Sequence, residues 1–124
     1  MEKARKLVEQ LSGLLASENR NNELIISIVT ELTDIATHCE KYLILRAETY
    51  LAVAKYAEAS SDAVRVLRFN PKSMSAHWIV GTSSFLQGDF EYALTSYKKA
   101  LSFDPESSKF IKQIRVSISH FIFL

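Results

Sequence analysis

The side chains that could bind a metal or carry out catalysis are scattered along this sequence. His38 and His77 have no second ligand at metal-binding spacing, and Cys39 has no His–Asp partner in sequence. We therefore expect His38 and His77 to be packed or solvated and Cys39 to be a small buried residue. The sequence predicts no catalytic residue, no metal site and no cofactor.

The serine, glycine and lysine patterns also lack the spacing that enzyme motifs need. Serine pairs at 60–61, 83–84 and 107–108 do not form a nucleophile elbow, and the three glycines lie too far apart for a phosphate-binding loop. The lysine pairs 98–99 and 109/112 are most simply solvated faces. An enzyme is therefore the weakest interpretation, and we expect a protein without catalytic activity.

Length and composition favour one globular domain. The chain has 124 residues, of which 48% are hydrophobic, and its net charge of +1 gives no electrostatic case for a nucleic-acid partner. A single cysteine excludes an internal disulfide, so an oxidising compartment is not implied. No run is long enough to span a bilayer, and no apolar signal region opens the chain. We expect a soluble, cytoplasmic protein without a membrane partner, with a nuclear location also open.

The strongest pattern is an internal repeat of 34 residues. Shifting by 34 places small residues on small ones, apolar residues on apolar ones, and Pro71 on Pro105. The matching pairs are Ala47 and Gly81, Leu51 and Phe85, Tyr56 and Phe90, Ala59 and Ala93, Ala63 and Tyr97, and Leu67 and Leu101. This agreement without a gap predicts two copies of one structural unit.

The second copy shows how the unit is built. Gly81 is small enough to let a neighbouring helix approach closely. Gly88 tolerates positive φ at a helix end, and Asp89 can cap the helix that follows. Asp104 stands before Pro105, where the α conformation is disfavoured, so the second helix should end there.

Hydrophobic periodicity predicts about seven helices. Two amphipathic helices are expected at Glu2–Ser17 and Glu23–Thr37. Four more are expected near 40–53, 57–69, 74–87 and 91–103, and Ser107 could cap a last helix. We divide the chain into a helix pair at 1–39, which could be a diverged repeat, repeats at 40–73 and 74–107, and a helix at 108–124 that caps the array or starts a further repeat.

The 34-residue unit resembles the tetratricopeptide repeat (TPR). The resemblance implies an all-α fold in which antiparallel helix pairs stack into an α-solenoid, a right-handed superhelix with a concave groove. The first helix of each pair lines that groove, and residues three and four apart point into it together. The candidate partner-binding residues are Lys41, Ile44, Glu48, Ser75, Trp78, Thr82, Lys109 and Lys112. Trp78 occupies a position where such repeats often place an aromatic, so for this residue we favour partial core packing over ligand contact.

A narrower resemblance is to the TPR arrays of DnaJ-type co-chaperones, roughly over residues 37–115. It rests on the segments 39–51, 56–59 and 100–106, and on Lys-Phe-Ile-Lys-Gln-Ile-Arg at 109–115. Members of that family carry a J domain with a His-Pro-Asp motif, which stimulates chaperone ATPase activity. The motif does not occur in this sequence, so the resemblance does not imply that activity for this chain.

Many chaperone-binding TPR domains hold an acidic peptide terminus with a carboxylate clamp of Lys, Asn and Arg. One register places the clamp positions at Gln10, Leu14, Leu45, Ser75 and Ile79. A second register places them at Ile44, Glu48, Ile79, Lys109 and Gln113, where only Lys109 matches. Apolar side chains cannot donate to a carboxylate. We therefore expect no tight recognition of that kind.

The sequence leaves two functions open. The first is a co-chaperone or adaptor that binds a protein or peptide partner, such as a molecular chaperone or its client, in the groove. The alternative is a scaffold subunit of a stable multiprotein complex. The four apolar residues Phe121–Leu124 either pack back on the preceding repeat, form a homodimer contact, or reflect truncation.

Overall fold

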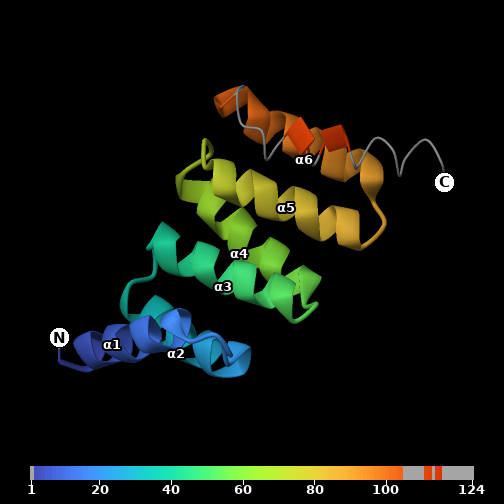
Figure 1. The fold of residues 1–124 in the computed structure, drawn as a ribbon. Coiled ribbons are helices and arrows are strands. Elements are labelled where there is room, and N and C mark those ends of the chain that lie inside the picture. Colours follow the sequence, from blue (N-terminus) through green and yellow to red (C-terminus); the bar gives the residue numbers. More distant parts are fainter. Residues whose placement is uncertain (1, 105–110, 113, 116–124) are drawn as a thin grey trace.

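The computed structural model describes residues 2–104, 111–112 and 114–115. These residues form an all-α structure without strands, as the sequence predicts. Consecutive helices fold back on one another and stack in chain order (Figure 1). The helices are α1 (Glu2–Ala16), α2 (Asn22–Ile35), α3 (Glu40–Ala52), α4 (Tyr56–Phe69), α5 (Met74–Leu86) and α6 (Phe90–Phe103).

Six helices are therefore complete in the described part of the chain, where the sequence predicts about seven. Residues 111–112 and 114–115 are also helical, and they fall in the segment expected to form the last helix. Lys109 and the apolar segment Phe121–Leu124 lie outside the described residues.

Local sequence explains where the helices begin and end. The side chains of Asn21, Ser73 and Asp89 accept hydrogen bonds from backbone N–H groups in the first turns of α2, α5 and α6. Gly88 has a φ of 89°, which confirms the turn predicted before Asp89. The helix α6 ends at Phe103, directly before the Asp104–Pro105 pair.

Gly81 permits the close approach that the sequence predicts. A Cβ atom at this position would lie 2.7 Å from two ring atoms of Tyr97 on α6. Tyr97 is fully buried, so its ring packs directly against the backbone of α5. The contact needs a residue without a side chain at position 81.

Among the described residues, two neighbouring hydrophobic clusters form much of the interior. The first joins α1 and α2, with Tyr42 and Leu45 of α3 packed against it. The second joins α3, α4 and α5 around residues that include Leu43, Ala47, Val66 and Ile79. Since α3 contributes to both clusters, it connects the N-terminal helix pair to the rest of the stack.

Buried positions recur along the chain at the predicted interval. Ile25, Ala59 and Ala93 are each fully buried, at equivalent places on α2, α4 and α6. The interval differs on α1, where the buried residues Leu7 and Leu11 match Leu43 and Ala47 at a spacing of 36. The loop before α2 is two residues longer than the loops before α4 and α6, which accounts for the shift. The repeat boundaries remain predictions.

A buried ion pair connects three helices. The Arg46 guanidinium of α3 donates to both carboxylate oxygens of Asp62 on α4, at 2.8 and 2.7 Å. It also donates to the hydroxyls of Thr30 and Thr33 on α2, at 3.2 and 3.3 Å. The hydrogen bonds and charge of Asp62 raise the pKa of Arg46, against the lowering effect of burial. The guanidinium therefore stays charged, and the helices α2, α3 and α4 are held in one arrangement.

Candidate functional site: a hollow lined by α1, α3 and α5

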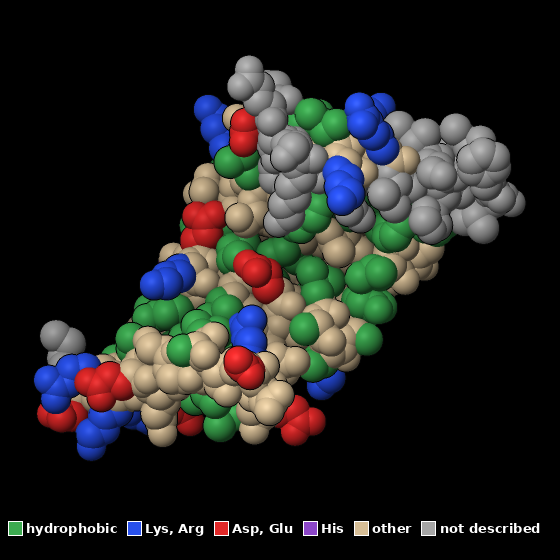
Figure 2. All heavy atoms as spheres, in the orientation of Figure 1, with side chains coloured by type: hydrophobic (Ala, Val, Ile, Leu, Met, Phe, Trp, Pro, Cys, Tyr) green, Lys and Arg blue, Asp and Glu red, His purple; other side chains and the backbone are tan. Residues whose placement is uncertain are grey.

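Four of the predicted groove residues line one open hollow. Lys41, Ile44 and Glu48 of α3 meet Ser75 of α5 around a volume of about 490 Å³. The same hollow is lined by Leu15 of α1 and by Glu40 and Leu45 of α3. Hydrophobic side chains gather around α3 and α5 on the face shown in Figure 2, with charged side chains spaced among them. We call this hollow the α3 hollow.

Helix geometry explains the shape of the α3 hollow. Residues 41, 44 and 48 follow one another at steps of three and four, so they share one face of α3. Ser75 lies in the first turn of α5, which begins after the N-cap residue Ser73. Leu15 reaches the hollow from the last turn of α1. The site is thus formed by α1, α3 and α5, which are the first helices of three successive helix pairs.

Charge in the α3 hollow is unevenly distributed. At the start of α3, Glu40 accepts a hydrogen bond from the Asn70 amide at 3.1 Å and stands next to the exposed Lys41. Glu48 is exposed about two turns further along. Among the described residues the ion pairs are Arg5–Glu2 and Arg46–Asp62, so the Glu48 carboxylate has no such counterion there.

Two other candidates take part in packing instead. Trp78 is half-buried against the α3–α4–α5 cluster, and its ring centroid lies 5.0 Å from that of Tyr97. The Tyr97 hydroxyl donates to the hydroxyl oxygen of Thr82 at 2.9 Å. Neither Trp78 nor Thr82 lines the α3 hollow. Lys112 is exposed, whereas Lys109 lies outside the described residues.

The structure corrects the register of the clamp positions on α1. The gap-free alignment selected Gln10 and Leu14, but the longer loop before α2 moves these positions by two, to Val8 and Ser12. On α3 and α5 the remaining clamp positions of this register are Leu45, Ser75 and Ile79. Leu45 lines the α3 hollow, and Ile79 is buried. None of these five side chains is cationic.

Leu15, Glu40 and Leu45 line the α3 hollow but are not among the predicted groove residues, although Leu45 is a clamp position of the first register. Leu15 belongs to the apolar stripe of the first predicted helix, and such a stripe normally faces the core. It is 38% exposed because α1 packs mainly on α2 and leaves the end of its stripe over the hollow. The sequence signal for this lining role was an apolar residue at the end of the stripe of α1.

His38 and His77 have neighbours typical of structural residues. His77 is 8% exposed, its Nε2 lies 2.9 Å from the carbonyl oxygen of Pro71, and its ring stacks on Phe103. His38 is exposed, with Nδ1 at 3.1 Å from the Thr37 hydroxyl. The described residues contain no group of three His, Cys, Asp or Glu side chains placed to hold a metal.

Cys39 is less enclosed than the sequence suggested. It is partly buried at the N-cap position of α3, without a side-chain cap hydrogen bond. The expected small buried residue is therefore at the edge of the packed region.

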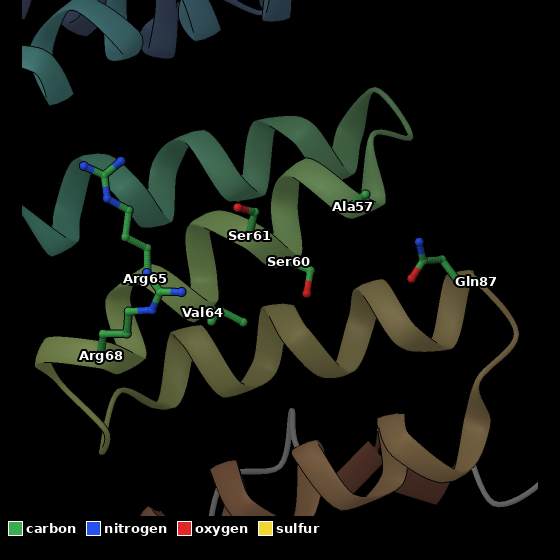
Figure 3. Close-up of a pocket in the computed structure, with 7 residues that line it drawn as sticks. All are labelled: Ala57, Ser60, Ser61, Val64, Arg65, Arg68 and Gln87. Atoms are coloured by element: carbon green, nitrogen blue, oxygen red, sulfur yellow. The ribbon is translucent and has the colours of Figure 1, made fainter.

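A second hollow of about 460 Å³ lies on α4 (Figure 3). Small side chains line this hollow along the first half of α4. Arg65 and Arg68 lie toward the end of α4, and Gln87 comes from the end of α5. None of the predicted groove residues lines this hollow, so it is separate from the α3 hollow.

The helices within residues 2–104 are all too short or too polar to cross a membrane.

Two curated relatives share modest identity with the chain. It is 21% identical over 110 residues to a DnaJ homolog subfamily C member 3 homolog of Dictyostelium discoideum, covering 87% of this chain and 22% of the relative. It is 25% identical over 92 residues to DnaJ homolog subfamily C member 7 of Homo sapiens, covering 74% and 19%. The chain thus spans about a fifth of the length of these relatives. No protein-family model matches the sequence.

Solved structures match over nearly the whole chain. The first TPR of Spaghetti (RPAP3), bound to the HSP90 peptide SRMEEVD, superposes with a TM-score of 0.86 at 21% identity, covering 98% of this chain and 94% of that one. The second TPR domain of human RPAP3, in complex with the HSP70 peptide SGPTIEEVD, gives 0.81 at 18% identity, covering 94% and 95%. Together with the stacked helix pairs and the 34-residue interval, these matches show that the chain has the tetratricopeptide-repeat fold.

Proposed function

We propose that this chain is a non-enzymatic protein-interaction module associated with molecular chaperones. In this role it acts as a co-chaperone or adaptor in the cytoplasm and binds peptide segments or client proteins. The binding surface is the α3 hollow, where Lys41, Ile44, Glu48 and Ser75 converge.

The observation that carries this proposal is the apolar character of an open hollow. Leu15, Ile44 and Leu45 contribute apolar side chains from two helices, and the hollow is large enough for a bulky side chain of a partner. Polar and charged groups surround these residues. Such a hollow suits the insertion of one hydrophobic side chain from an extended or helical peptide.

The comparisons support the chaperone association. Both curated relatives are DnaJ subfamily C proteins, and both RPAP3 structures hold a chaperone peptide. The five clamp positions of the first register lack cationic side chains, and in the second register only Lys109 is cationic. The support therefore concerns the class of partner rather than the two acidic peptides bound in those structures.

The proposal is tested by a substitution that places a bulky side chain at the edge of the α3 hollow. Ser75 is exposed, so Ser75→Tyr adds a ring to the hollow without removing a buried group. Ser27→Tyr, at an exposed position of α2, is the matched control. Chaperones or their clients captured from lysate by the unmodified chain and by the control, but not by Ser75→Tyr, would support the proposal.

The alternative function is that of a scaffold subunit in a stable complex. Large apolar side chains are exposed away from the hollow, including Leu24 at 44%, Ile35 at 55% and Tyr92 at 53%. A permanent partner could cover them. One complex of fixed stoichiometry, retained by both tyrosine variants, would favour the scaffold and contradict binding in the hollow.

A further inference from the structure

We infer that the α3 hollow selects segments in which a hydrophobic residue and a Lys or Arg are separated by one residue. This inference rests on the proposed function, because it assigns a ligand class to the same hollow. It concerns the chemistry of the ligand and not the identity of the partner.

The hydrophobic requirement comes from the floor of the hollow. Ile44 and Leu45 are partly buried, and each packs on one of the two hydrophobic clusters. Their remaining surface, together with Leu15, faces the open volume. An inserted apolar side chain would extend the protein's own hydrophobic clusters and remove this surface from water.

The basic requirement comes from Glu48. Glu40 and Lys41 are adjacent at the start of α3 and have opposite charges, so they offset one another. Glu48 lies at the far end of the hollow without an ion-pair partner in the described part of the chain. Arg20 lines a smaller adjacent hollow of about 130 Å³ with Glu48, but no ion pair joins the two side chains. A ligand cation can therefore pair with Glu48.

The one-residue separation follows from the geometry of α3. Ile44 and Glu48 are four residues apart on a helix, which places them about 6 Å apart along its axis. In an extended peptide, alternate side chains lie on the same side at about 6.6 Å. A hydrophobic residue over Ile44 and a basic residue two positions away would thus reach the hollow and Glu48 together.

The ligand class is the opposite of an acidic peptide terminus. A carboxylate needs cationic or N–H donors, whereas α3 and α5 hold Leu45, Ser75 and Ile79 at the clamp positions of the first register. In the second register these helices hold Ile44, Glu48 and Ile79. An acidic residue near Glu48 would also meet a like charge.

The test measures binding of labelled nine-residue Gly/Ser peptides to the intact chain by fluorescence anisotropy. The reference peptides contain Leu-Ser-Arg or Arg-Ser-Leu, to cover both chain directions. Comparison peptides replace Arg by Glu, place Arg directly beside Leu, or replace Leu by Ser. We expect one reference peptide to bind about threefold more tightly than its Glu and adjacent-Arg forms. We expect the Ser form to bind least.

Variants that change charged residues of the protein test whether the preference for Arg over Glu peptides arises at Glu48. Glu48→Lys should reverse the preference between Arg and Glu peptides, and Arg20→Ala should strengthen binding of the Arg peptide. Glu91→Lys, an exposed residue in the first turn of α6, is the control and should leave the preference unchanged.

Two failures are distinguishable. If all Leu peptides bind equally well, or if Glu48→Lys leaves the preference intact, the inferred ligand class is wrong, but binding in the hollow is not contradicted. If the Leu peptides bind no better than the Ser peptide, both the ligand class and the proposed hollow are contradicted.

Discussion

At the scale of single residues, Ala54 stands out because of its backbone conformation. Its φ is 62°, and it is the non-glycine residue with positive φ among the described residues. The equivalent position in the next repeat, 34 residues later, is Gly88 with a φ of 89°. Both residues lie in the loop between the two helices of a pair. An L-residue in this conformation is strained, whereas glycine is not.

We therefore expect Ala54→Gly to stabilise the protein by about 0.5–1 kcal/mol. Relief of the left-handed conformation contributes about 1–2 kcal/mol, and the greater freedom of glycine in the unfolded chain offsets part of it. The reciprocal change, Gly88→Ala, should destabilise by a similar amount. Urea unfolding of both variants measures the free energies, and a loss of stability in Ala54→Gly would show that the loop does not keep this conformation.

Sequence reasoning succeeded at residues whose chemistry acts locally. Gly88 and Asp89 make a turn and a cap through their own backbone and side chain, so their types predict their roles. The residue type of Ala54 gives no such signal, because alanine rarely adopts a positive φ. Its equivalence to Gly88 in the repeat was the available signal.

At the scale of helix pairs, Gly81 sets the separation of α5 and α6. The added Cβ of Gly81→Ala would clash with the Tyr97 ring at 2.7 Å, and Tyr97 is too tightly enclosed to move freely. We expect a loss of about 1–3 kcal/mol, as for other overpacked interiors.

Gly13→Ala is the matched control for this change. Gly13 lies within α1, and an added Cβ meets no atom within 4 Å. The substitution should be neutral or stabilising by about 0.5–1 kcal/mol, because alanine favours the helix. If both alanine variants unfold at the same urea concentration, the close packing of Gly81 on Tyr97 does not matter to stability.

The Arg46–Asp62 pair is a second contact between helices on which stability depends. In Asp62→Ala the guanidinium, with a side chain only 12% exposed, would lose its partner, so we expect a loss of about 3 kcal/mol. Replacing both residues by leucine should recover most of this loss, since no charge is then left unpaired. Thermal and urea unfolding compare the variants, and an equally unstable double variant would contradict this account.

Helix positions were predictable from the sequence, but the side-chain contacts between helices were not. The expected helices 40–53, 57–69, 74–87 and 91–103 agree with α3 to α6 within one residue at each end, since hydrophobic spacing and turn residues are local signals. Arg46 and Asp62 are 16 residues apart and look like ordinary surface charges in the sequence. Only the stacking of α3 on α4 brings them together.

At the scale of the whole molecule, the sequence repeat predicts the fold, whereas the α3 hollow forms only where the stacked helices meet. The 34-residue interval predicts successive helix pairs, and the described residues show them. The α3 hollow depends on three helices, and the two extra residues in the loop 17–21 shift the sequence register of its α1 wall by two positions. A gap-free alignment could not show that Leu15 completes the hollow, because the length of that loop sets its position.

The most direct test of the central claim is a map of peptide contacts by nuclear magnetic resonance. Amide shifts of the intact, isotope-labelled chain would be followed while the Leu-Ser-Arg and Arg-Ser-Leu peptides are added. The account predicts that the largest changes occur at Ile44, Glu48 and Ser75. Changes confined to the second hollow around Ser61 and Arg65, or no changes at saturating peptide, would contradict the α3 hollow as the binding surface.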